Sequence, residues 1–137
     1  MGILRKIQVW AIIFLCTAVL AACGINREDK SGVKAAKMVH VQLDVPNKAN
    51  AGSSINLKAS VTQGNQTVKD ADEVMFEIWK EGGKKNSSMI DARNQHNGTY
   101  TAQVKLQDPG KYEVQVHVTA RDMHVMPKKK IIVEQAK

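Results

Sequence analysis

The chain has 137 residues and a formal net charge of +7. This length suits one folded domain after an N-terminal targeting segment and is too short for two. Apart from the run at 128–130, the lysines are scattered and not interleaved with aromatic residues, so the positive charge gives nucleic-acid binding little support.

Residues 1–22 are predicted to be a lipoprotein signal peptide. Arg5 and Lys6 precede the 14-residue apolar run IQVWAIIFLCTAVL, which is too short for an ordinary transmembrane helix and typical of a secretory signal. The run ends in LAAC, which resembles the lipobox of bacterial lipoproteins. We therefore expect cleavage before Cys23, lipidation of Cys23, and anchoring at the extracytoplasmic face of the bacterial cell membrane. An uncleaved N-terminal anchor helix is the alternative.

The two cysteines limit the chemistry of the mature protein. Cys16 lies in the signal peptide and Cys23 would carry lipid, so no free thiol remains. This excludes a disulfide framework, a CxxC redox site and a thiolate metal site. Residues 23–36 are charged and polar, as expected for a flexible tether, and residues 37–137 are predicted to be the folded domain.

From Met38 onward, apolar and polar residues alternate with a period of two, which is typical of strands. The pattern predicts seven strands separated by turn sequences and no helix. The predicted strands lie near residues 39–45, 55–61, 74–79, 87–93, 100–106, 112–118 and 129–134. Such a series favours an all-β fold, an antiparallel immunoglobulin-like sandwich.

Tyr112 begins the sixth predicted strand, directly after the turn sequence DPGK. This arrangement resembles the tyrosine corner of immunoglobulin-like domains, in which the phenol bonds back to the preceding turn. We therefore predict a structural role for Tyr112.

The strand pattern also predicts where the histidine and methionine side chains lie. In a seven-stranded immunoglobulin-like sandwich, the third, sixth and seventh strands share a sheet. Alternation then places Met75, Trp79, His117 and Met126 on the outer face of that sheet. Met123 and His124 are expected in the adjoining loop, within the sequence MHVMP. His96, in the hairpin NQHNG, would approach them only if that turn folded over.

This residue set favours copper. Thioethers prefer Cu(I), imidazoles bind both copper oxidation states, and an exported protein without thiols would depend on such ligands. Zinc is less favoured because cysteines are absent and imidazoles are few. The alternative is a metal-free interaction module that docks a membrane protein through the Trp79 face, with the methionines serving as packing residues. No catalytic motif is present, so we do not expect an enzyme.

Four segments resemble the YtkA-like family of exported bacterial lipoproteins, which is related to FixH-like domains. They are FEIWK (76–80), HNGTY (96–100), DPGKYEVQVHVTA (108–120) and MHVMPKKKIIV (123–133). The resemblance implies an immunoglobulin-like sandwich and an association of some members with copper handling and assembly of haem–copper oxidases.

The resemblance supports His117, Met123, His124 and Met126 as metal ligands. Met75, from the strand alternation, and His96, from its hairpin, are further candidates. The expected function is that of a membrane-anchored, extracytoplasmic copper chaperone that binds Cu(I). Its expected partners are the membrane, through the lipid, and an oxidase subunit or another copper protein, with no nucleic acid.

Overall fold

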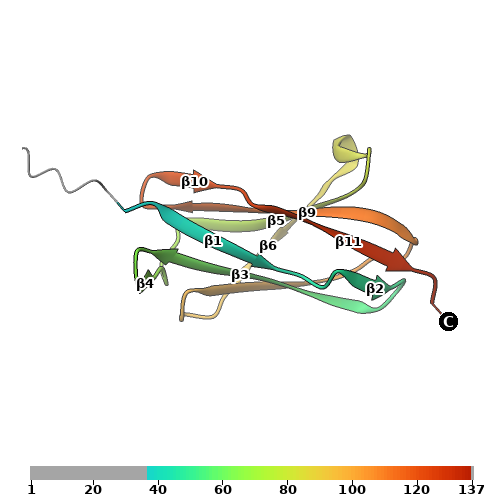
Figure 1. Cartoon of the computed structure of the whole chain (residues 1–137), viewed down its shortest axis with the longest axis horizontal. Coiled ribbons are helices and arrows are strands. Elements are labelled where there is room, and N and C mark those ends of the chain that lie inside the picture. Colours follow the sequence, from blue (N-terminus) through green and yellow to red (C-terminus); the bar gives the residue numbers. More distant parts are fainter. Residues whose placement is uncertain (1–36, 137) are drawn as a thin grey trace, which may run out of the picture. The chain divides into compact units, whose positions relative to one another are not determined.

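The computed structural model describes residues 37–136, in which the regular structure is β-strand apart from one short 3₁₀ turn, η1 (Lys84–Asn86) (Figure 1). The predicted signal peptide, the lipidation site Cys23 and the predicted tether lie outside the described residues. Within residues 37–136, no helix is long and apolar enough to cross a membrane.

The strands form two sheets. The first sheet has the order β1 (Val39–Asp44), β3 (Ser54–Gln63), β8 (Thr99–Lys105), β7 (Arg93–Asn94), and β4 (Gln66–Thr67) pairs with β3. The second has the order β2 (Lys48–Asn50), β11 (Lys128–Glu134), β9 (Gly110–Ala120), β5 (Glu73–Lys80), β6 (Ser88–Asp91), and β10 (Met123–Val125) pairs with β9. Every pairing is antiparallel except that of β2 with β11.

The predicted all-β sandwich is confirmed, but its strand count was wrong: the described residues form eleven strands, not seven. The additional strands are the two- and three-residue segments β2, β4, β7 and β10. Prolines account for two of the breaks between consecutive strands. Pro46 lies between β1 and β2, which belong to different sheets, and Pro127 separates β10 from β11. A proline has no N–H to donate to a strand ladder.

The core is mainly aliphatic and lies between the two sheets. Alternate residues of β9, from Tyr112 to Ala120, are buried, as are those of β3 from Ile55 to Val61. Phe76 on β5 is fully buried among them. Burying a Val, Leu, Ile or Phe side chain contributes about 1.5–3 kcal/mol, so this alternating set stabilises the sandwich without disulfides.

Two tyrosines fasten loops to the sheets. The Tyr112 hydroxyl donates to the carbonyl oxygen of Asp108 at 2.9 Å, which is the contact expected of a tyrosine corner. The Tyr100 hydroxyl, which the sequence did not single out, donates to the Val68 carbonyl at 3.0 Å and accepts from the Ala71 N–H at 3.0 Å. The buried Tyr100 therefore holds the segment between β4 and β5.

The segment expected to be a loop around Met123 is instead the short strand β10. It is joined to β9 by a tight turn whose central residues Arg121 and Asp122 have φ angles of 54° and 58°. Two positive φ angles are the signature of a type I′ hairpin turn, whose twist matches that of the flanking strands. The Arg121 guanidinium also forms an ion pair with Asp70, at 2.7 Å.

Candidate metal-binding site

The site begins with the register of three neighbouring strands in the second sheet. Met75 on β5 pairs directly with His117 on β9. The flanking residues Val74 and Phe76 of β5, and Val116 and Val118 of β9, are in the core. Because side chains alternate along a strand, Met75 and His117 both lie on the outer face of the sheet.

Met126 continues this row on the other side of His117. Val125 of β10 pairs with Val118, and Lys128 of β11 pairs with Gln115. The two pairings share one register, which places Met126 opposite His117 across the interruption. The Val116 N–H donates to the Pro127 carbonyl at 3.1 Å, as this register requires. Pro127 therefore removes one donor from the ladder and leaves the register unchanged.

His124 lies next to this row. It pairs with Thr119 on β9, and its Nδ1 is 2.9 Å from the Thr119 hydroxyl oxygen. The ring centroids of His117 and His124 are 5.8 Å apart, with the planes tilted by 43°. Thus two imidazoles and the two thioether residues Met75 and Met126 share one region of the outer face. In Figure 1, β10, β9 and β5 lie in the same layer.

Glu77 contacts His117 from β5. Its Oε2 lies 2.9 Å from His117 Nε2 and 4.0 Å from Lys84 Nζ. A side-chain hydrogen bond with Ser87 lowers the pKa of Glu77, burial partly opposes this, and His117 and Lys84 lower it further. The group is therefore held as a carboxylate beside the imidazole.

The remaining predicted ligands lie elsewhere. Met123 pairs with the buried Ala120 and packs against the core, so its side chain is on the opposite face of β10 from His124. His96 lies in the turn between β7 and β8 of the first sheet, where its N–H donates to the Asn94 side chain at 2.8 Å. The structure therefore does not bring Met123 or His96 into the row of Met75, His117 and Met126.

Three residues at the site were not identified from the sequence as site residues: Glu77, Thr119 and Met89. Met89 is exposed on β6 and pairs with Glu77. Its neighbour Ile90 pairs with the core residue Phe76 and packs against the core, so alternation puts Met89 on the outer face. The same period-two argument could have found Met89, but the contacts of Glu77 and Thr119 required the tertiary structure.

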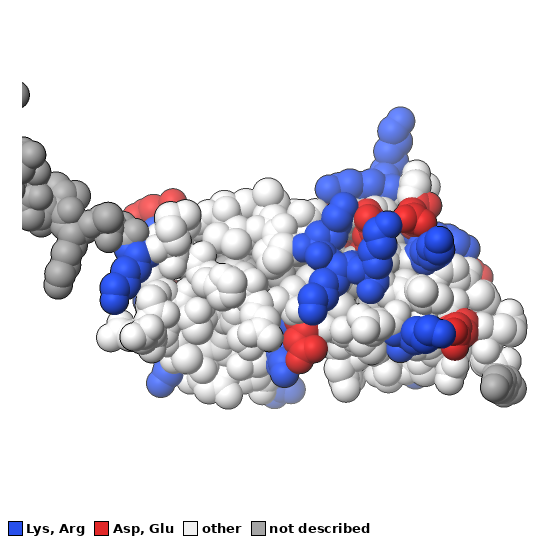
Figure 2. Space-filling model, in the orientation of Figure 1, with Lys and Arg blue, Asp and Glu red and all other residues white. Residues whose placement is uncertain are grey.

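Trp79 shares this outer face, as predicted, but it is only 4% exposed. Lys84 and Lys128 cover it, with their Nζ atoms 4.7 Å and 5.7 Å from the centroid of the indole ring. Figure 2 shows basic side chains gathered on the half of the view that contains η1 and β11, whereas the surface around β10 is mostly uncharged. The indole ring is therefore not an open docking surface.

Among residues 37–136, no group of three or more His, Cys, Asp or Glu side chains is arranged to hold a metal ion. A metal bound by the described residues near His117 would therefore depend on thioether ligands in addition to imidazole. Thioethers are soft ligands, so this donor set fits Cu(I) better than zinc.

The YtkA-like family profile matches residues 34–117. The chain belongs to the YtkA-like family. The match ends at His117, so β10 and Met126 of this YtkA-like chain lie beyond the matched residues. No curated protein matches the chain.

Solved structures share the fold of this YtkA-like domain. CopC from Methylosinus trichosporium OB3b is 18% identical with a TM-score of 0.51, over 72% of this chain and 97% of CopC. A superoxide reductase (neelaredoxin) from Ignicoccus hospitalis is 17% identical with a TM-score of 0.50, over 70% of this chain and 82% of the reductase. An engineered protein is 15% identical with a TM-score of 0.55, over 73% of this chain but only 20% of the engineered protein.

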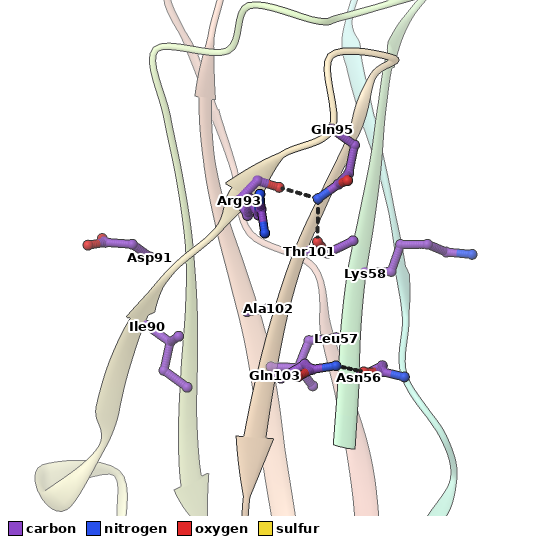
Figure 3. A pocket seen from close by; sticks show the side chains of 10 residues that line it. All are labelled: Asn56, Leu57, Lys58, Ile90, Asp91, Arg93, Gln95, Thr101, Ala102 and Gln103. Atoms are coloured by element: carbon purple, nitrogen blue, oxygen red, sulfur yellow. Dashed lines mark hydrogen bonds between the residues drawn. The ribbon is translucent and has the colours of Figure 1, made fainter. Parts of the chain in front are cut away.

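A hollow of about 620 Å³ lies away from the histidines of the outer face and is lined mainly by the first sheet and β6 (Figure 3). Its polar side chains bond to one another: Gln95 donates to Thr101 at 2.8 Å, and Gln103 donates to Asn56 at 2.8 Å. None of the predicted metal ligands lines it.

Proposed function

We propose that this protein is a membrane-anchored, extracytoplasmic copper-binding protein that acts as a chaperone in copper supply or in haem–copper oxidase assembly. The observation that carries the proposal is the row of Met75, His117 and Met126 across three strand segments, with His124 beside it. The proposed role is binding and transfer rather than catalysis.

The proposed ligands are His117, His124, Met126 and Met75. Met126 is 47% exposed and the His117 side chain is 20% exposed. A metal held at the surface of a sheet is accessible to a partner, which suits a carrier. Met123 is left out of the proposed ligands because its side chain packs on the core side of β10.

The resemblance that implied copper handling for some YtkA-like proteins supports the same function. The anchor is part of the proposal: a lipid on Cys23 would hold the domain at the extracytoplasmic membrane surface. There, an oxidase subunit or another copper protein would be within reach. In that location thiols are prone to oxidation, and thioether and imidazole ligands are more durable.

The test is a Cu(I) titration of the full chain, kept in solution with detergent, against a competing chelator under reducing conditions. We expect one Cu(I) per chain and much weaker binding of Zn(II). Replacing both His117 and His124 with Ala should weaken Cu(I) binding tenfold or more, which corresponds to about 1.4 kcal/mol.

The control uses the other two histidines of the described residues. His40 and His96 are exposed and belong to the first sheet and its β7–β8 turn. Replacing both with Ala removes the same number of imidazoles from the domain and should leave the Cu(I) affinity within twofold of the wild-type value. If the two double variants bind Cu(I) equally well, His117 and His124 are not ligands and the copper proposal fails.

The alternative of a metal-free module that docks through Trp79 finds less support, because Lys84 and Lys128 cover the ring. That alternative would be favoured if the wild-type chain failed to bind Cu(I).

A further inference from the structure

Glu77 is the only charged side chain that is buried in the part of the chain that the structure describes, with 8% exposure. It lies on the outer face of β5, between Met75 and Trp79 in sequence. Burying a carboxylate is costly unless hydrogen bonds and opposite charges compensate. The compensating groups here are Ser87, Lys84 and His117.

The contact with His117 has a consequence for the imidazole. An ionised carboxylate can only accept hydrogen bonds, so His117 Nε2, 2.9 Å from Glu77 Oε2, must be the nitrogen that carries the proton. In a neutral imidazole the lone pair then resides on Nδ1. The partner of one ring nitrogen thus determines which nitrogen is available to a metal.

We propose that Glu77 is a positioning residue that makes His117 offer Nδ1, and not Nε2, as its metal-binding atom. This inference rests on the proposed copper function and specifies how the site is built. Met75 on β5 and Met126 between β10 and β11 flank His117, so the residue whose tautomer is fixed lies at the centre of the row.

His124 differs from His117 in this respect. Its Nδ1 partner is the Thr119 hydroxyl, at 2.9 Å, and a hydroxyl can rotate to donate or to accept. Thr119 therefore holds the ring in place without selecting a tautomer. The two histidines provide an internal comparison: a single tautomer is expected for His117, and no such preference is imposed by Thr119 on His124.

A carboxylate behind a ligating histidine also holds the ring in a fixed orientation. Loss of such a partner typically weakens metal binding 10- to 100-fold. Glu77→Gln keeps the size of the side chain but offers both a donor and an acceptor, so it no longer selects the Nε2–H tautomer. We expect Cu(I) binding to weaken by about tenfold or more in this variant.

The matched control is Glu113→Gln. Glu113 lies on the same outer face, on β9, and its carboxylate is 3.2 Å from Lys128 Nζ. It pairs with Trp79 and not with the His117 row. This variant removes the same charge from the same face, so we expect Cu(I) binding to change by less than twofold.

The decisive measurement needs no copper. Long-range proton–nitrogen NMR spectra of the ¹⁵N-labelled full chain in detergent, at about pH 8 where an ordinary imidazole is neutral, report which ring nitrogen is protonated. We expect His117 to be the Nε2–H tautomer, and this preference to weaken in Glu77→Gln but not in Glu113→Gln.

The outcomes separate this inference from the copper proposal. An Nδ1–H tautomer of His117, or an unchanged Cu(I) affinity in Glu77→Gln, overturns the role of Glu77 in a protein that still binds Cu(I). If the Nε2–H tautomer is found but the wild-type chain binds no Cu(I), the proposed function is overturned, and the positioning role with it.

Discussion

Met75 and His117 lie directly opposite each other on β5 and β9, on the face of the sheet that points away from the core. Directly paired residues in an antiparallel sheet have Cβ atoms about 4.5–5.5 Å apart. A thioether therefore flanks the imidazole from β5, and the register of β10 and β11 places Met126 on its other side. The ligand set is defined by strand register and not by closeness in sequence.

This register makes the two methionines of MHVM chemically different. Met126 lies in the row with His117, whereas Met123 packs against the core. We expect Met126→Leu to weaken Cu(I) binding tenfold or more, measured by competition with a Cu(I) chelator. Met123→Leu should change Cu(I) affinity by less than twofold and stability by less than about 1.5 kcal/mol, because the swap nearly conserves volume.

The result is informative in either direction. If Met123→Leu weakens Cu(I) binding as strongly as Met126→Leu does, β10 must rearrange to bring Met123 to the metal. If neither substitution has an effect, the thioethers of this segment are packing residues.

The two buried tyrosine hydroxyls should contribute unequally to stability. Tyr112→Phe removes one hydrogen bond, to Asp108, and should cost about 1 kcal/mol. Tyr100→Phe leaves both the Val68 carbonyl and the Ala71 N–H without this partner and should cost about 2 kcal/mol. Urea unfolding of the two variants measures the difference, and equal midpoints would contradict it.

The β9–β10 turn offers a stabilising substitution. Asp122 has a φ of 58°, which is unfavourable for most residues and costs glycine nothing. Asp122→Gly should therefore raise the free energy of unfolding by about 0.5–1 kcal/mol, after the greater freedom of glycine in the unfolded chain is subtracted. Asp122→Ala, which keeps the Cβ, is the control and should give no gain. A lower thermal midpoint for Asp122→Gly would show that the Asp122 side chain stabilises the turn.

Lipidation is tested on the protein itself. Mass spectrometry of the mature, membrane-extracted protein should find a diacylglycerol-modified Cys23 at the N-terminus. Cys23→Ala should abolish the modification. Recovery of an intact Met1 terminus from the membrane would contradict cleavage and favour the uncleaved anchor.

The sequence by itself determined the class of fold and the faces of its main strands. The alternation of Val74, Phe76 and Ile78 with Met75, Glu77 and Trp79 assigns each side chain to one face, because successive strand residues point to opposite sides. The same period predicted that His117 and Met126 share the outer face with Met75. These are local properties of each strand, so they do not depend on how the turns between the strands are built.

The tertiary structure alone decided which of those residues meet, and in what environment. That Met75 is opposite His117 depends on the register between distant strands, which a period of two does not specify. The burial of Trp79 depends on Lys84 and Lys128 reaching over it from other segments. The bond between Glu77 and His117, 40 residues apart in sequence, depends on the pairing of β5 with β9. The local pattern identifies the candidate ligand residues, and the packing of the strands determines which of them a single metal ion could reach.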